Sequence, residues 1–311
     1  MADDHSPFEQ LHQLPNQYYQ AQCVLLQDEL LILGGRYNNN CYTYSISQSR
    51  YKFICSYPDQ MSLWGHAVVK LKDKKKGAKL LSFGGMNKHT LILDYESVWN
   101  TKSKKNHSWA TAPQKIGDPT DDLRNVRALI GGTNDQFLFY IYAPKHIVAL
   151  DSKSLKMVAS DILPFDGKIS GGNCFVKAKQ NKMLLFGNTN HGLAITYNEQ
   201  TKTFQYQKLA LCFDLWHVWD YAYVYVGNFV ILFGGYDYVD GLSLNKVHIY
   251  NIKQNRWKQS SHKLSMAMKF SFAIFREHDV CIYIMGGVVD GYQESRQLLK
   301  LPLRKILERV L

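Results

Sequence analysis

Histidine, cysteine and tyrosine are the residues of this chain that could hold a metal ion or transfer a proton. The 311-residue sequence contains 11 His, 6 Cys and 20 Tyr. No CxxC spacing occurs, no two histidines have the spacing of metal ligands on one helix face, and no HxH pair stands near a carboxylate. GxSxG, P-loop and dinucleotide-binding motifs are also absent. We therefore predict no catalytic residue, no metal site and no cofactor, and we interpret the cysteines as buried, reduced thiols.

A second group of side chains has the composition of a protein-binding surface. Aromatic residues, arginine and histidine follow short apolar runs or precede the next run, and such loop residues are typical of interfaces. The candidates are Arg36, Tyr37, Trp64, His89, Trp216, His217, Tyr236, Tyr238 and Tyr292. The alternative for some of them is a place in the core, because Trp64 and Trp219 directly precede predicted strands.

A third group is basic. The chain has 37 Lys and Arg against 26 Asp and Glu, a net charge of +11. Two lysine-rich segments include Lys72, Lys74, Lys75, Lys76, Lys79, Lys104 and Lys105. Such a patch attracts phosphate groups or an acidic protein surface, and the alternative is a solvated lysine-rich loop. No nucleic-acid motif accompanies these lysines, so we do not expect a nucleic-acid partner.

The elements that must position these side chains repeat along the chain. A short apolar run ends in Gly-Gly at 30–35, 80–85, 230–235 and 281–287. Degraded copies occur at 137–142 and at 183–188, where Asn188 replaces the second glycine. Asn tolerates positive φ better than other non-glycine residues, so the turn is preserved. The copies lie about 50 residues apart, which is the period of a propeller blade and predicts six units.

Each unit has the pattern of four strands. An apolar first strand, such as 65–69, precedes the strand that ends in the glycine pair. A third strand alternates, as at 247–252, and a polar fourth strand carries a bulky aromatic, such as Trp257. Buried inner strands are continuously apolar whereas half-exposed outer strands alternate, so this gradient favours a radial blade.

These residues resemble the kelch repeat, in which an apolar run, a glycine pair, a Tyr and a Trp follow one another. The fifth unit fits best, with Gly234, Gly235, Tyr250 and Trp257. The second unit has Gly84-Gly85 and Trp109, and the first has Tyr44 and Tyr51 in the Tyr and Trp positions. The resemblance implies an all-β fold, a single closed β-propeller of about six four-stranded kelch-type blades.

We expect three segments along the chain. Residues 1–7 form a disordered N-terminus, residues 8–303 form the propeller, and residues 304–311 form a tail or short helix. The last unit has only three strands, and the segment from residue 8 onward has the pattern of an outermost strand. The N-terminal strand is therefore predicted to complete the last blade and to leave no open sheet edge.

The kelch resemblance implies a non-enzymatic protein–protein interaction module that binds through its loop face. Scaffold, cytoskeletal and substrate-receptor roles are all compatible, with actin or a ubiquitin-ligase adaptor as partners. One alternative is an enzyme at the central channel mouth, of the kelch-like copper radical oxidase type, and another is a binder of acidic or phosphate-bearing partners through the lysines. No apolar run approaches the ~20 residues of a membrane span, and the N-terminus lacks a secretory signal. We therefore expect a cytoplasmic monomer.

Overall fold

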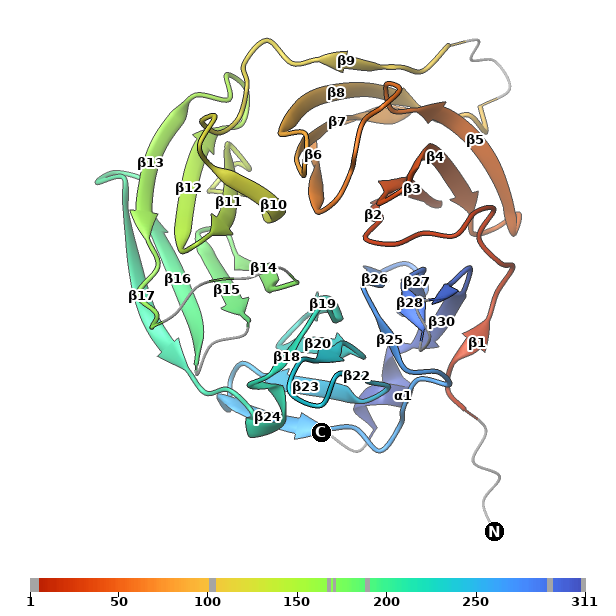
Figure 1. The fold of residues 1–311 in the computed structure, drawn as a ribbon, viewed down its shortest axis with the longest axis vertical. Helices are drawn as coiled ribbons and strands as arrows, with labels where there is room; N and C mark the ends of the chain where they lie inside the picture. The colour runs from red at the N-terminus through yellow and green to blue at the C-terminus, as the bar shows by residue number, and fades with distance from the viewer. Residues whose placement is uncertain are drawn as a thin grey trace. The chain divides into compact units, whose positions relative to one another are not determined.

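The computed structural model describes residues 6–100, 105–166, 169, 172–187, 191–289 and 293–308. These residues form mostly antiparallel strands, together with the 3-10 helix η1 (Phe213–Leu215) and the helix α1 (Leu303–Leu307) (Figure 1). The chain divides into two compact units. Unit 1 contains Met1–Gln20 and Ala210–Leu311, and unit 2 contains Ala21–Leu209.

Unit 2 contains four sheets of four strands, and the strands of each sheet follow one another in chain order. The first two sheets are formed by β2 (Gln22–Leu26), β3 (Glu29–Gly35), β4 (Asn38–Ser45) and β5 (Arg50–Ser56), and by β6 (His66–Lys74), β7 (Gly77–Gly84), β8 (His89–Glu96) and β9 (Trp109–Thr111). The next two are formed by β10 (Asp122–Gly131), β11 (Phe137–Ala143), β12 (His146–Asp151) and β13 (Met157–Ile162), and by β14 (Cys174–Lys179), β15 (Lys182–Phe186), β16 (Gly192–Asn198) and β17 (Thr203–Leu209).

Unit 1 contains two four-stranded sheets and two short three-stranded sheets within its described residues. The four-stranded sheets are β19 (Ala222–Val226), β20 (Phe229–Phe233), β23 (Val247–Asn251) and β24 (Arg256–Gln259), and then β26 (Phe272–Arg276), β27 (Cys281–Met285), β30 (Leu298–Pro302) and β1 (Glu9–Gln10). The short sheets are β18 (Val218–Trp219), β21 (Tyr236–Asp237) and β22 (Leu242–Ser243), and β25 (Met268–Lys269), β28 (Val288–Val289) and β29 (Gln293–Glu294).

The six four-stranded sheets of the described residues coincide with the six predicted units. The two short sheets were not predicted, and they bring the number of sheets among these residues to eight. Each pairs the residues before a first strand with the residues after a glycine pair, so neither shows the apolar period of a strand in the four-stranded sheets.

The N-terminal segment supplies a strand to the last sheet, as the sequence predicts. Glu9 pairs with Lys300 and Gln10 with Leu299, and the backbone N–H of Leu11 donates to the carbonyl of Leu298 at 2.8 Å. Of the predicted disordered segment 1–7, residues 1–5 lie outside the described residues. Of the predicted C-terminal tail or helix, α1 covers residues 303–307, and residues 309–311 lie outside the described part.

Burial decreases from the second strand to the fourth in each four-stranded sheet, as predicted, but first strands such as β6 and β10 are partly exposed. The second strands β3, β20 and β27 are buried along their whole length, whereas the fourth strands β13 and β24 are mostly exposed. First strands of successive sheets contact one another within a unit, β2 with β6, β6 with β10, and β19 with β26. Each hydrophobic core combines side chains of two neighbouring sheets, so a sheet is stabilised by its neighbour in the unit.

The glycine pairs let the chain approach the next sheet closely. Gly235 has φ of +109°, and its N–H donates to the carbonyl of Met268 at 2.9 Å. A Cβ at this position would lie 2.7 Å from Cγ1 of Val218. The second glycine of the last pair, Gly287, likewise donates to the carbonyl of Tyr18 at 2.8 Å. The pair is therefore required by positive φ and by lack of space, which explains why the motif repeats.

Candidate functional site

Exposed apolar side chains gather on one part of unit 1. We call it the platform: helix η1, the sheet β18–β21–β22 and the residues that connect them. In this sheet Trp219 pairs with Tyr236, and Tyr236 pairs with Ser243. The large apolar residues of the platform that are exposed by 41% to 73% are Phe213, Trp216, Tyr238, Val239 and Leu242.

Helix η1 presents two of these aromatics on one side of a single turn. Its N–H groups close the turn, from Leu215 to the carbonyl of Cys212 at 3.0 Å and from Trp216 to that of Phe213 at 3.1 Å. Leu215 is 2% exposed and anchors the turn, while the rings of Phe213 and Trp216 lie 5.1 Å apart and face outward. A buried leucine thus fixes an exposed aromatic pair.

Three aromatic rings of the platform pack edge to face. The ring centroids of Trp219 and Tyr238 are 3.7 Å apart, and those of Tyr236 and Tyr238 are 4.6 Å apart. The hydroxyl of Tyr238 donates to Oδ2 of Asp220 at 3.1 Å, and burial raises the pKa of this phenol. Nζ of Lys269 lies 3.5 Å from the centroid of the Tyr236 ring, with only 6% of this lysine exposed. These contacts hold the rings in fixed orientations before any partner binds.

Carboxylates border the aromatic rings. Oδ1 of Asp237 accepts the N–H groups of Val239 at 2.9 Å and Asp240 at 3.2 Å, which shapes the loop that carries Tyr238. Asp214 and Asp240 are exposed. The platform therefore offers aromatic faces beside negative charge, in a chain whose net charge is positive.

Four of the predicted interface residues belong to the platform. Trp216, His217, Tyr236 and Tyr238 lie together there, and the carbonyl of His217 accepts the N–H of Tyr238 at 3.1 Å. The sequence did not identify Phe213, Val239 and Leu242. For Phe213 a signal was present, because Phe213 and Trp216 are three residues apart with Leu215 between them, the spacing of one helical turn.

The other predicted interface residues lie elsewhere. In unit 2 the guanidinium of Arg36 lies 4.0 Å from the ring of Trp64 and 4.7 Å from that of Tyr37, which is 78% exposed. These three residues form a separate, smaller cluster. Tyr292 lies outside the described residues.

His89 is buried, so the prediction that it belongs to an exposed interface is wrong. It is 7% exposed, its Nε2 lies 2.7 Å from Oγ of Ser82, and its ring packs against Tyr57 and His66. Burial, followed by the neighbouring His66, lowers the pKa of His89 to about 3. The first residue of β8 therefore lies in the core of this sheet.

The two lysine segments meet at one carboxylate. Asp94 pairs with Lys74, and with Lys105 at 3.2 Å, and the lysines hold the pKa of Asp94 below its usual value. Four further lysines of the β6–β7 hairpin are exposed: Lys72, Lys75, Lys76 and Lys79. Lys104 lies outside the described residues.

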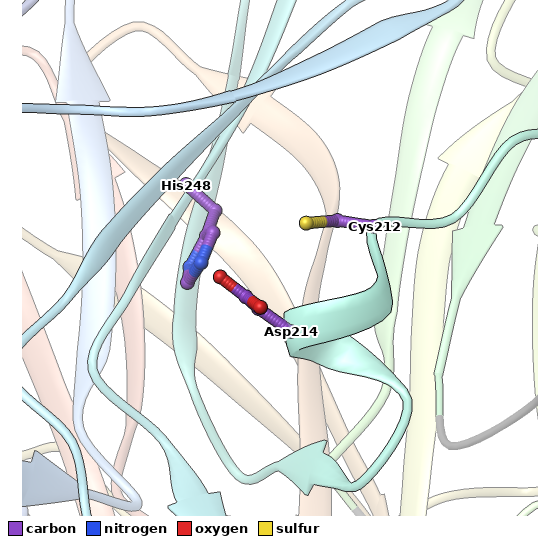
Figure 2. A group of neighbouring side chains, drawn as sticks. All are labelled: Cys212, Asp214 and His248. Atoms are coloured by element: carbon purple, nitrogen blue, oxygen red, sulfur yellow. The ribbon is translucent and has the colours of Figure 1, made fainter.

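The structure also brings together three side chains that the sequence did not connect. Cys212, Asp214 and His248 each place one possible metal-ligand atom within 4.8 Å of the others (Figure 2). Cys212 precedes η1, Asp214 lies in η1, and His248 lies on β23. No regular spacing joins these positions, so a search for metal-ligand spacings in the sequence could not find the group.

Comparisons with known proteins give a fold. No protein-family model matches the sequence, and no curated protein matches it. A solved structure described as "Structure of YjhT" is similar over 93% of this chain and 95% of its own, with a TM-score of 0.70 and 13% sequence identity. At this identity the likeness concerns the fold alone. None of the helices in the described residues has the length and hydropathy needed to span a membrane.

Proposed function

We propose that this chain is a kelch-type β-propeller that acts as a non-enzymatic protein-interaction module and binds its partner through the platform. The propeller rests on the six glycine-marked repeats, on the six four-stranded sheets and on the similarity to a solved structure at a TM-score of 0.70. In this proposal the module works as a monomer in the cytoplasm.

The observation that carries the binding function is the set of exposed aromatic and aliphatic side chains on a fixed backbone. Phe213 is 73% exposed and Tyr238 47%, although both belong to segments anchored by Leu215 and Asp220. Interface energy concentrates in such rigid aromatic residues, since little side-chain entropy is lost when they bind. A core role does not account for side chains that face solvent.

The chemistry of the platform defines the kind of partner. Its aromatic faces and its carboxylates Asp214, Asp237 and Asp240 suit a protein surface that combines apolar side chains with Arg or Lys. Actin and a ubiquitin-ligase adaptor, the partners that the kelch resemblance implies, are the first two to test.

The test compares the native chain with a Phe213→Ser/Trp216→Ala/Tyr238→Ala variant in affinity capture at low and moderate salt, and in co-sedimentation with purified actin. The control variant is Met157→Ala/Ile162→Ala, because these residues are 67% and 63% exposed in unit 2. The proposal predicts that partners stay bound at moderate salt, bind the control variant and fail to bind the platform variant. Partners that bind all three proteins equally would overturn it.

A second candidate function is anion binding by the β6–β7 hairpin. Its support is the group of exposed lysines beside the Asp94-linked pair Lys74 and Lys105. Binding of this kind weakens steeply as salt rises, because counterions are released from the anion. A Lys74→Glu/Lys75→Glu/Lys76→Glu variant should lose binding to heparin and to anionic vesicles, and unchanged binding would remove this candidate.

A further inference from the structure

Cys212, Asp214 and His248 form a mixed sulfur, oxygen and nitrogen cluster in unit 1. Their possible ligand atoms all lie within 4.8 Å of one another. Figure 2 shows the imidazole ring of His248 beside the carboxylate of Asp214, with the sulfur of Cys212 directed toward the same space. The three residues come from the start of η1 and from β23, so the cluster links a surface turn to a buried strand.

Hydrogen bonds hold the segment before Cys212 against the hairpin that carries His248. The indole N–H of Trp257 donates to the carbonyl of Ala210 at 2.9 Å, and the N–H of Ala210 donates to Oδ1 of Asn255 at 3.3 Å. These bonds fix the chain two residues before Cys212 on the β23–β24 hairpin. His248 alternates with the core residues Val247 and Ile249 along β23, so it faces away from that core and toward the incoming segment.

His248 has an unsatisfied polar atom at this position. The residue is 1% exposed, and its Nε2 is buried without a hydrogen-bond partner. Burying such an atom unpaired costs about 1–3 kcal/mol, a cost that a bound ligand would remove.

We propose that Cys212, Asp214 and His248 bind one divalent cation of the zinc type. Zinc accepts thiolate, imidazole and carboxylate ligands together, whereas magnesium and calcium prefer oxygen ligands alone. Around zinc the ligand atoms would lie roughly 3.3–3.8 Å apart, given bonds of about 2.0–2.3 Å in a tetrahedron. Small side-chain rotations therefore close the cluster on the ion, and the fourth position remains for water or for a group of the partner.

The charges around the cluster suit a dication. On binding the ion, Cys212 would release its thiol proton to solvent, and the resulting thiolate and the carboxylate of Asp214 would contribute two negative charges. Lys246 is a cationic neighbour of both Cys212 and His248. The ion would also join η1 to β23 and so stabilise the turn that presents Phe213 and Trp216. Metal binding would then order one end of the platform.

The experiment is a titration of untagged, chelator-treated protein with Co²⁺, followed by competition with Zn²⁺. We expect one equivalent to bind, with thiolate-to-cobalt charge-transfer absorption and the visible bands of a tetrahedral ion. Cys212→Ser should abolish the charge-transfer absorption, and Asp214→Asn should weaken binding about tenfold. Neither residue is buried, so both variants are expected to fold; His248→Gln is a third variant, with folding checked by circular dichroism.

Matched controls are His278→Gln and Asp240→Asn, which change exposed residues outside the cluster. Both should bind Co²⁺ as the native chain does. The proposal is overturned if no saturable equivalent binds, if the charge-transfer absorption survives in Cys212→Ser, or if the control variants weaken binding as much as Asp214→Asn.

Discussion

The platform sheet β18–β21–β22 and the second short sheet β25–β28–β29 follow the same path in the chain. Each sheet contains a two-residue strand that precedes the first strand of a four-stranded sheet. This short strand pairs with the two residues after a glycine pair, and a third short strand completes the sheet. Gly235 and Gly287 are equivalent in the two sheets, with φ of +109° and +98°. The backbone is therefore repeated in both places.

The side chains of the two sheets differ. At equivalent positions the platform carries Trp219 and Tyr236, which are partly buried, and the second sheet carries Lys269 and Val288, which are buried. The platform also leads to the exposed Tyr238. The repeat thus determines where strands run, and the residues at each position decide whether a sheet is a surface or part of the core. A search for function should start where partly exposed aromatic side chains replace buried residues on the same backbone.

The largest effect is expected from a change that breaks the platform backbone. Gly235→Ala would place Cβ 2.7 Å from Cγ1 of Val218 and 3.0 Å from the carbonyl of Trp219, at a φ that L residues rarely adopt. We expect the free energy of unfolding to fall by about 2–4 kcal/mol. Gly227→Ala is the control, because its Cβ would meet nothing within 4 Å and only φ of +58° opposes it, a cost of about 1 kcal/mol. Equal losses in urea denaturation would contradict this account of the glycine pair.

A pH series tests the buried histidines of both units. The pKa values of His89 and His248 are lowered to about 3 and about 4, against about 6.5 in the unfolded chain. Between these values the unfolded state binds protons that the folded state does not, so stability is full above about pH 6.5 and falls as the pH drops toward 4. Each histidine should account for a loss on the order of 1–3 kcal/mol.

The measurement is denaturation by urea at several pH values between 7.5 and 4.5. His248→Gln should reduce the dependence on pH, and the exposed His278→Gln should not. A native chain whose stability is constant over this range would show that the pKa values of these rings are the same in the folded and unfolded states.

A smaller effect is expected where the two short sheets touch. Lys269 of the second sheet lies over the ring of Tyr236 in the platform and is 6% exposed. A double-mutant cycle of Lys269→Met and Tyr236→Leu should give a coupling energy of about 1 kcal/mol, the size of a partly desolvated cation–π contact. A coupling energy indistinguishable from zero would mean that the ammonium is held by other groups.

The smallest effect is expected from the lysine hairpin of unit 2. Lys75→Glu/Lys76→Glu changes two exposed residues, so the free energy of unfolding should stay within about 0.5 kcal/mol of the native value. Binding through the platform should be unchanged. If this variant lost partner binding at moderate salt, the main binding site would be the hairpin and not the platform.

The long strands were predictable because their signals are local and periodic. Runs such as 230–235 are continuously apolar and end in a glycine pair, and both properties follow from burial and from a tight turn. The pairing of β1 with β30 was predictable because the last unit lacked a strand. The short sheets were not, since two-residue strands carry no period and exist only where two loops meet.

The candidate sites were predictable only in part. His89 and Tyr236 both lie shortly after a glycine pair, yet His89 turns into the core toward Ser82 whereas Tyr236 lies in the platform. Tyr236 is the first residue after its glycine pair, whereas His89 is the fourth and is the first residue of β8, and the sequence does not give the length of the loop between the pair and the third strand. The approach of Cys212 to His248 depends on the bond between Trp257 and Ala210.

The most direct test of the central claim is site-specific photo-crosslinking in cytosol. A benzophenone side chain is placed either at Leu242 of the platform or at Gln293 of the second short sheet, both exposed positions. The account predicts partner crosslinks from position 242 that disappear in a Trp216→Ala/Tyr238→Ala background, and none from position 293. Equal crosslinking from both positions, or crosslinks at 242 that survive loss of the two aromatics, would contradict the platform as the binding surface.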